Sequence, residues 1–240
     1  MKRRHSWRQL IPVLCATVVG VSLVAVNGEA GADHVPGEGD WDCEGDVLVM
    51  RDGALGRLGL DDGAYIDTAT IDGDAFANSL AFDADERWLR GVVRESGQPA
   101  VVTYAADGSV VHEAQIGGDY PPAADQFAGT ALDDGRLVIH SVGRRDGSGW
   151  FEGSQHHLWE LDPDTGDTSH IGAVPVRLSD LAENPSDGML YHARFGRVYR
   201  IDPSDGSTTS QSVADADGFP QSDFGGSWFE SPDQLVLVQN

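Results

Sequence analysis

The sequence predicts an all-β fold built from a repeated unit of four strands, on the basis of three observations. Apolar runs of roughly four to eight residues, rich in β-branched and aromatic side chains, alternate with turns that contain Asp, Gly and Pro. The same order of strand types recurs about every 40–55 residues. No stretch shows the apolar period of an amphipathic helix. These features are typical of a β-propeller, in which four-stranded blades surround a central axis; a β-sandwich with reordered strands is the alternative.

Residues 1–32 are predicted to be an export signal and not part of the fold. Basic residues precede an uncharged apolar run at 10–26, and Ala30 and Ala32 supply the small residues that signal peptidase reads. We expect cleavage after Ala32, so that the secreted chain begins at Asp33. A membrane anchor is the alternative, because the apolar run is close to the shortest length that spans a bilayer. Residues 33–45 would then form an acidic linker, and residues 46–240 the propeller domain.

The chain is strongly acidic, with 39 Asp and Glu against 16 Lys and Arg and a formal net charge of −23. Such a surface repels phosphate backbones and acidic lipids, so we expect no nucleic-acid partner and, once the signal is cleaved, no membrane association. Cys15 lies in the signal, which leaves Cys43 as the one cysteine of the secreted chain and only an intermolecular disulfide open to it. We expect a secreted, extracellular monomer.

Within each repeat the strands follow in the order A, B, C, D, with strand A innermost. Strand A begins with small or polar residues and ends apolar, strand B is a short apolar run after a tight turn, and strand D is rich in Thr, Ser and Val. The clearest copies are residues 78–82, 128–132, 179–183 and 225–229 for A; 88–89, 137–139, 189–191 and 235–237 for B; 55–60, 101–104, 158–162 and 198–202 for C; and 64–71, 167–171 and 207–213 for D. Glycine in the connecting turns supplies the positive φ that a tight hairpin needs.

The two ends of the repeat region are incomplete sets. The last A and B strands, from residue 225 onward, have no C and D strands after them, and the first C and D strands have no clear A strand before them. We expect the N- and C-terminal strands to pair and close the ring, because an unpaired apolar edge invites aggregation. This gives four blades with residues 46–50 as a spare strand, or five blades with incomplete ends.

Several segments resemble a family of secreted bacterial propeller-like proteins with no assigned activity. Residues 158–166 (LWELDPDTG) and 198–206 (VYRIDPSDG) resemble its LYRIDPATG repeat, and residues 181–191 (LAENPSDGMLY) resemble its LAYNPVDGLLY segment. Residues 224–229 and 235–240 are similar to its FGAMWFDADGNLYVSNN segment. The resemblance, loosely shared with NHL-type and lactonase-type propellers, implies fold and export but no catalytic residues.

The longer, varied connections are predicted to lie on one face of the propeller, and this face is the candidate binding surface. The A–B and C–D links are short turns, whereas the B–C and D–A links are longer. Candidate ligand-binding residues at the mouth of the channel are Asp74, Asn78, Asp125, Gln126, Arg177, Asp180 and Asp223. Candidate contact residues in the loop at 143–151 are Arg144, Arg145, Trp150 and Phe151, because exposed aromatic side chains can stack on sugars or anchor a protein partner.

Calcium is the cofactor left open, and we otherwise expect none. A ring of oxygen-bearing side chains suits calcium, and Asp180, Asp223 and Asn78 are the candidate ligands. We favour the alternative, in which these side chains are solvated caps of the inner strands. Asp162 and Asp215 begin Asp-rich segments that we interpret as turns and not as calcium loops. His156 and His157 open one strand, so their side chains should point to opposite faces.

The sequence therefore favours a secreted, non-catalytic propeller that binds an unidentified extracellular ligand or protein on its loop face. It contains no G-x-S-x-G, H-E-x-x-H or C-x-x-C motif. The alternative is a calcium-dependent hydrolase of the lactonase or esterase type, with a carboxylate site at the channel mouth.

Overall fold

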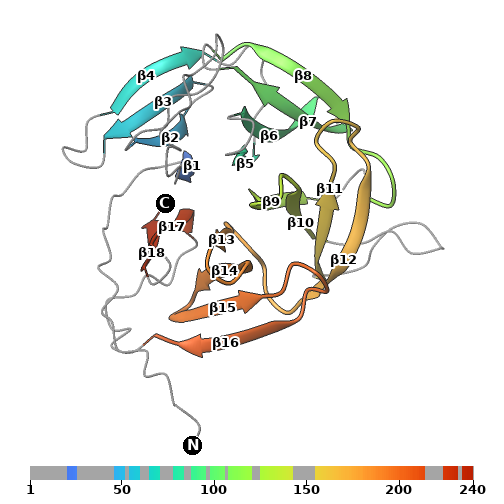
Figure 1. Ribbon diagram of the computed structural model, residues 1–240, viewed down its shortest axis with the longest axis vertical. Helices are drawn as coiled ribbons and strands as arrows, with labels where there is room; N and C mark the ends of the chain where they lie inside the picture. The colour runs from blue at the N-terminus through green and yellow to red at the C-terminus, as the bar shows by residue number, and fades with distance from the viewer. Residues whose placement is uncertain are drawn as a thin grey trace, which may run out of the picture.

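The computed structural model describes residues 21–25, 46–51, 54–59, 65–70, 78–83, 88–95, 98–105, 108–120, 125–142, 155–213, 224–231 and 234–239, and these form strands, turns and bends with no helix among them. The strands make five antiparallel sheets that follow one another around a ring, with the first strand of each sheet toward the middle (Figure 1). In the described part of the chain, four sheets have four strands and the last has two. The predicted all-β fold with four-stranded units is confirmed.

Each four-stranded sheet is a meander in which successive strands are neighbours. The first sheet contains β1 (Val21–Ala25), β2 (Asp46–Arg51), β3 (Ala54–Gly59) and β4 (Tyr65–Thr70). The second contains β5 (Asn78–Asp83), β6 (Trp88–Glu95), β7 (Gln98–Tyr104) and β8 (Val110–Gln115). The third contains β9 (Asp125–Ala131), β10 (Leu137–Val142), β11 (His156–Leu161) and β12 (Thr168–Val174). The fourth contains β13 (Ala182–Asn184), β14 (Met189–Arg194), β15 (Arg197–Ile201) and β16 (Thr208–Ser212), and the last contains β17 (Phe224–Ser231) and β18 (Gln234–Gln239).

The first and last sheets differ from the expected arrangement of the chain ends. Residues 46–50 are not a spare strand: they lie in β2, which pairs with both β1 and β3. The inner position of the first sheet is taken by β1, which comes from the apolar run assigned to the export signal. Among the described strands, β17 pairs with β18 and with no strand of the first sheet, and it lies beside β1 without a shared ladder. The expected hydrogen-bonded pairing of the chain ends is therefore not found, because β1 and β2 fill the positions left for β17 and β18.

The Asp-rich segment at residues 162–167 is a hairpin turn, as predicted. The Asp162 side-chain oxygen Oδ1 accepts hydrogen bonds from the backbone N–H groups of Asp164 at 2.9 Å and Thr165 at 3.1 Å. Gly166 ends the turn with a φ of +76°. This is an Asx-type turn, in which the carboxylate is used by the local backbone.

The hairpin turns of one sheet pack against the outer strand of the sheet before it. At Gly166, a Cβ atom would clash with the backbone carbonyl oxygen of Gln115, and the Gly166 carbonyl oxygen accepts the Gly117 N–H at 2.9 Å. The next pair of sheets repeats this contact, because a Cβ atom at Gly172 in β12 would clash with the carbonyl oxygen of Asp205. Glycine allows the two backbones to approach closely at both places.

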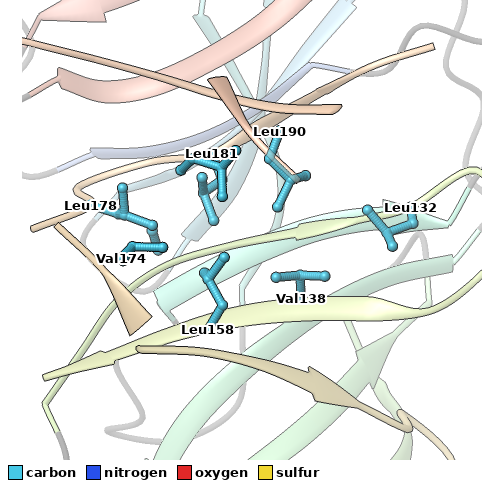
Figure 2. Packing of buried hydrophobic residues seen from close by; sticks show 9 residues of the cluster. Leu132, Val138, Leu158, Val174, Leu178, Leu181 and Leu190 are labelled. Atoms are coloured by element: carbon cyan, nitrogen blue, oxygen red, sulfur yellow. The ribbon is translucent and has the colours of Figure 1, made fainter. Parts of the chain in front are cut away.

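The hydrophobic core is divided into clusters that lie between neighbouring sheets. Between the second and third sheets, Trp159 and Ile139 pack with Val92 and Val101. Between the third and fourth sheets, Val138 and Leu158 face Leu178, Leu181 and Leu190 (Figure 2). Between the fourth and last sheets, Ala182 and Ala193 pack with Phe229, Leu235 and Leu237. Because side chains alternate along a strand, each middle sheet contributes one face to each of two clusters.

Most of the apolar run on which the membrane-anchor alternative rests lies outside the described residues. Within the described ranges, no helix is long and apolar enough to cross a membrane.

Candidate functional site

The end of the third and fourth sheets that carries the B–C and D–A links gathers polar side chains. The prediction of a longer B–C link is wrong for the fourth sheet, where only two residues separate β14 from β15. His140 lies near the end of β10, His156 begins β11, and His192 and Arg194 lie near the end of β14. Arg177, Ser179 and Asp180 precede β13, and Ser227 lies in β17. We call these eight residues the loop-end cluster: His140, His156, Arg177, Ser179, Asp180, His192, Arg194 and Ser227.

A pair of histidines forms one side of the loop-end cluster. The His140 Nε2 and His156 Nδ1 atoms are 3.1 Å apart, and the two rings are stacked with their centroids 5.2 Å apart. His140 is fully buried. Burial lowers the pKa of His140 well below its usual value, and His156, His192, Arg177 and His157 nearby lower it further. The pair is therefore uncharged at neutral pH and is held beside cationic groups.

Asp180 lies at the buried end of the cluster. The Asp180 backbone carbonyl accepts a hydrogen bond from His192 Nδ1 at 2.9 Å, in the tautomer that carries a proton there. Burial raises the pKa of the Asp180 carboxyl to about 7, although the Ser227 hydroxyl and the backbone N–H groups of Leu181 and Ser227 oppose this rise. The carboxyl group is thus a mixture of protonated and ionised forms at neutral pH.

Three buried oxygens in this region have no hydrogen-bond partner of ordinary geometry: Ser179 Oγ, Asp180 Oδ2 and Ser227 Oγ. Most buried polar atoms in native proteins have such a partner, since a buried polar atom without one destabilises the fold. Asp180 in the β12–β13 link and Ser227 in β17 lie close enough for the Ser227 hydroxyl to interact with the Asp180 carboxyl. Ser179 precedes Asp180 in the same link.

The outer part of the cluster is cationic and ends in an exposed aromatic side chain. Arg194 Nη1 donates a hydrogen bond to the Arg177 carbonyl at 3.1 Å, which joins the end of β14 to the β12–β13 link. Burial is the main cause that lowers the pKa of His156, and the positive charges of Arg177 and Arg194 lower it further. The Arg194 guanidinium lies over the ring of Phe195, 4.5 Å from its centroid. From Phe195 to Asp180, the groups therefore pass from exposed and aromatic, through cationic, to buried and acidic.

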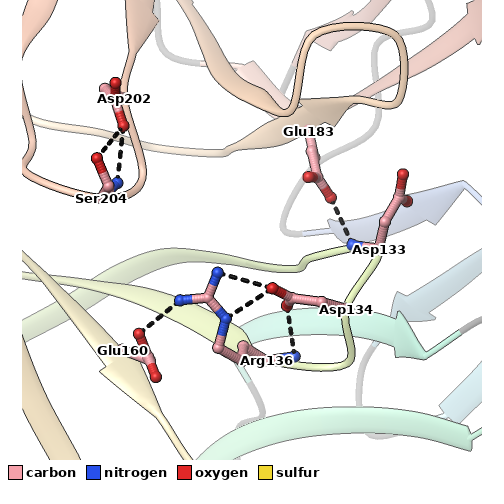
Figure 3. Close-up of polar contacts among 7 residues, drawn as sticks. All are labelled: Asp133, Asp134, Arg136, Glu160, Glu183, Asp202 and Ser204. Carbon is pink, nitrogen blue, oxygen red and sulfur yellow. Dashed lines mark hydrogen bonds and ion pairs between the residues drawn. The ribbon is translucent and has the colours of Figure 1, made fainter.

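At the opposite end of the same sheets, the charged side chains of the turns form hydrogen bonds and ion pairs with one another and with the backbone (Figure 3). Arg136 bridges Asp134 and Glu160, with nitrogen–oxygen distances of 2.7 Å in both ion pairs. The Glu183 carboxylate accepts the Asp133 N–H at 2.7 Å, and Asp202 accepts from Ser204. Burial and the charges of Asp133 and Asp134 raise the pKa of Glu183 to about 7. These groups stabilise turns and neighbouring sheets, and we assign them no ligand.

The structure brings together two of the predicted site residues, Arg177 and Asp180, in the loop-end cluster. Asn78 is the first residue of β5, so the predicted start of this inner strand is correct. Asp125 and Gln126 open β9, which begins three residues before the predicted strand at 128–132. Asp74 and Asp223 lie outside the described residues, as do Arg144, Arg145, Trp150, Phe151 and Asp215.

His156 and His157 point to opposite faces of β11, as predicted. His156 contacts His140, whereas His157 Nδ1 is 3.0 Å from His170 Nε2 on the side that packs toward the second sheet. The two histidine pairs were missed because each joins strands whose register cannot be read from the sequence. Among the described residues, no group of three or more His, Cys, Asp or Glu side chains is placed to hold a metal ion.

Comparisons with known proteins bear on the fold. No family model matches the chain, and no curated protein matches it. A structure of luciferin-regenerating enzyme is 12% identical with a TM-score of 0.52, covering 82% of this chain and 66% of that one. A chain of a nidogen–laminin complex is 11% identical with a TM-score of 0.50, covering 77% of this chain and 64% of that one. The Cps50 (Swd1) β-propeller domain of Myceliophteria thermophila is 13% identical with a TM-score of 0.47, covering 80% and 58%.

The ring of antiparallel sheets, each with its first strand innermost, is the arrangement of a β-propeller. At these identities the likeness shows the fold alone, and the propeller spans less than two thirds of the length of several matched chains, such as 64% and 59%. The resemblance of its repeats to the secreted bacterial family stays a prediction.

Proposed function

We propose that this protein is an exported, non-catalytic propeller that binds a ligand at its loop end, through the loop-end cluster. The observation that supports this is that Ser179 Oγ, Asp180 Oδ2 and Ser227 Oγ are buried without a hydrogen-bond partner of ordinary geometry. A ligand that bonded to these atoms would offset the free energy that their burial costs.

The contrast between the two ends of the sheets supports the choice of site. At the turn end, carboxylates such as Asp134 and Asp202 have partners within their own turns. At the loop end, polar groups from separate links and strands contact one another in pairs: His140 with His156, His192 with the Asp180 carbonyl, and Arg194 with the Arg177 carbonyl. Polar groups that local structure does not need are expected at sites with a function.

The test uses thermal melting of the purified chain with separate additions of methyl glycosides, small carboxylic acids, inorganic phosphate and calcium chloride. A binding probe should raise the Tm of the natural protein and should lose this effect in Asp180→Asn and Ser227→Ala. His112→Ala is the control, because His112 is exposed and contacts the Asp164 carbonyl away from the cluster. No shift with any probe counts against the proposal.

The same assay separates the proposal from a calcium-dependent hydrolase. The hydrolase would be supported by a Tm increase with calcium alone, which EDTA reverses and Asp180→Asn abolishes, together with turnover of a lactone or ester. These results would replace the proposed binding function by hydrolysis. A shift with an organic probe and none with calcium supports the binding protein.

We also propose that the sheets form five blades, with a two-stranded last blade, and that in the chain that retains residues 21–25 the ring is closed by packing of β17 beside β1. This is supported by the contact between β1 and β17 and by the contact of β17 with β13 on its other side. The closure uses neighbouring inner strands in place of the hydrogen-bonded pairing expected from the sequence.

Export is the remaining part of the proposal, and it is tested by the N-terminal residue of the protein recovered from the medium. Cleavage after Ala32 would give Asp33 as the first residue. It would remove β1, and with it the contact between β1 and β17, and would leave β2 at the inner edge of the first sheet. A chain that still begins at Met1 would contradict the predicted processing.

A further inference from the structure

The two-residue turn between β14 and β15 holds an aromatic residue in a conformation that such residues rarely adopt. Arg194 and Arg197 face each other across the hairpin, so Phe195 and Gly196 form its turn. Their φ angles are +49° and +70°, and Phe195 is the non-glycine residue with positive φ in the described part of the chain. Two positive φ angles define a type I′ turn, for which Asn-Gly is the favoured pair.

Phe195 is also exposed, with 51% of its surface accessible. A phenylalanine in the left-handed region destabilises the turn, and an exposed ring recovers little by burial. Asn at this position would suit the backbone and the solvent better. A strained, exposed aromatic side chain beside a candidate site points to a role in contact with another molecule.

The surroundings of Phe195 define the chemistry of that molecule. Arg194 lies over one face of the ring and donates to the Arg177 carbonyl, so the ring stands at the outer end of the loop-end cluster. Guanidinium groups recognise carboxylates through paired hydrogen bonds. Two arginines at one site stand out in a chain with 39 acidic and 16 basic residues, whose overall charge repels anions.

We propose that the ligand is an acidic saccharide, whose sugar ring stacks on Phe195 and whose carboxylate is held by Arg194 and Arg177. This rests on the proposed function, because it names the ligand class for the same site. A pyranose ring offers a flat apolar face that can stack on the aromatic ring of Phe195. Phe195 then acts as the outer anchor of the site.

The experiment is an NMR titration of the full chain with methyl β-D-glucuronide and methyl β-D-glucoside, which differ by a carboxylate in place of a hydroxymethyl group. The glucuronide should bind about tenfold more tightly or better, at low ionic strength, and this preference should shrink as salt is added. Arg194→Gln should remove the preference. Phe195→Asn should weaken binding of the glucuronide about tenfold or more while leaving the Tm unchanged or higher, so loss of the fold cannot explain it.

Arg200→Gln is the matched control, because Arg200 lies at the other end of β15 and pairs with Asp187 at 3.2 Å. It removes the same charge and should leave both affinities unchanged. Equal affinity for the two sugars, no binding of either, or unchanged binding in Phe195→Asn would each overturn the acidic-saccharide proposal. If a neutral probe binds and Asp180→Asn abolishes its binding, the proposed function stands and only the ligand class is wrong.

Discussion

Asp180 is a buried carboxyl group that the fold holds close to its titration point. Its pKa is about 7 in the folded chain, against 3.8 for an ordinary Asp. A raised pKa means that the protonated form is favoured by folding, so this contribution to stability is fully present below the ordinary pKa and is lost as pH rises through about 7. Binding at the cluster is therefore expected to respond to pH near neutrality.

Asp180→Asn should remove this pH dependence. Between pH 6 and pH 8 the natural protein should lose stability, on the order of 1 kcal/mol, that the variant keeps. The measurement is the free energy of unfolding of both proteins by denaturant at several pH values, because the difference between them cancels every other titrating group. A constant difference across this range would mean that Asp180 does not titrate there.

Phe195→Asn should stabilise the protein by about 1 kcal/mol, because Asn tolerates the left-handed backbone that the β14–β15 turn requires. A rise of a few degrees in Tm is the expected reading. Phe195→Ala is the control: it removes the ring but keeps the backbone strain, so its Tm should not rise. If Phe195→Asn lowers the Tm, the stacking of Arg194 on the ring supports the fold more than the strain harms it.

Only part of the site could be predicted at the level of single residues. Arg177 and Asp180 were named as channel-mouth candidates because they lie at the start of a recognisable inner strand, and their role stays a prediction. His140 and His156 were not, because their contact depends on the register of β10 and β11 across a connection of unknown geometry, and that register contains a shift in the neighbouring pair. The strain at Phe195 has a weak signal in the sequence. If Arg194 and Arg197 pair across a hairpin, Phe195 and Gly196 are the two turn residues, and phenylalanine is unusual in such a turn.

At the scale of elements, turn residues made the strand order readable. The Asp-Gly turns and the recurring apolar runs identify the strands of the second, third and fourth sheets, because tight antiparallel hairpins need those residues. Strand lengths were less accurate: β13 contains only Ala182–Asn184, since Asn184 starts a turn by accepting the Ser186 N–H at 2.9 Å. The inner strand β1 was assigned to the export signal because its apolar composition fits both uses.

The close backbone approach at Gly172 sets the fit between the third and fourth sheets. Gly172→Ala should destabilise the protein by about 1–3 kcal/mol, because a Cβ atom there clashes with the Asp205 carbonyl and must push the sheets apart. Chemical denaturation measures this loss. Gly117→Ala is the control, since nothing lies within 4 Å of a Cβ atom at Gly117. Equal effects of the two substitutions would mean that backbone freedom, and not the inter-sheet contact, is what matters.

At the scale of the whole molecule, β17 and β18 complete a core that the fourth sheet cannot complete alone. Deleting residues 224–240 removes the buried Phe229, Leu235 and Leu237 and exposes Ala182 and Ala193. The expected cost is on the order of 6 kcal/mol or more, comparable to the stability of a whole domain. Circular dichroism on heating should show the loss of the cooperative transition.

The control for this deletion removes residue 240 alone and should melt like the natural protein. A chain shortened at residue 223 that stays monomeric with an unchanged Tm would show that the other four sheets are stable without the last one, and the proposed closure would be wrong.

The division of the core between neighbouring sheets has a consequence for synthesis. When the third sheet leaves the ribosome, Val138 and Leu158 still lack Leu178, Leu181 and Leu190, which belong to the next segment. The growing chain therefore exposes one apolar sheet face until the following sheet is made. We expect premature stops between residues 162 and 213 to give insoluble fragments, and a nascent chain held open in this way would be a ready client for chaperones.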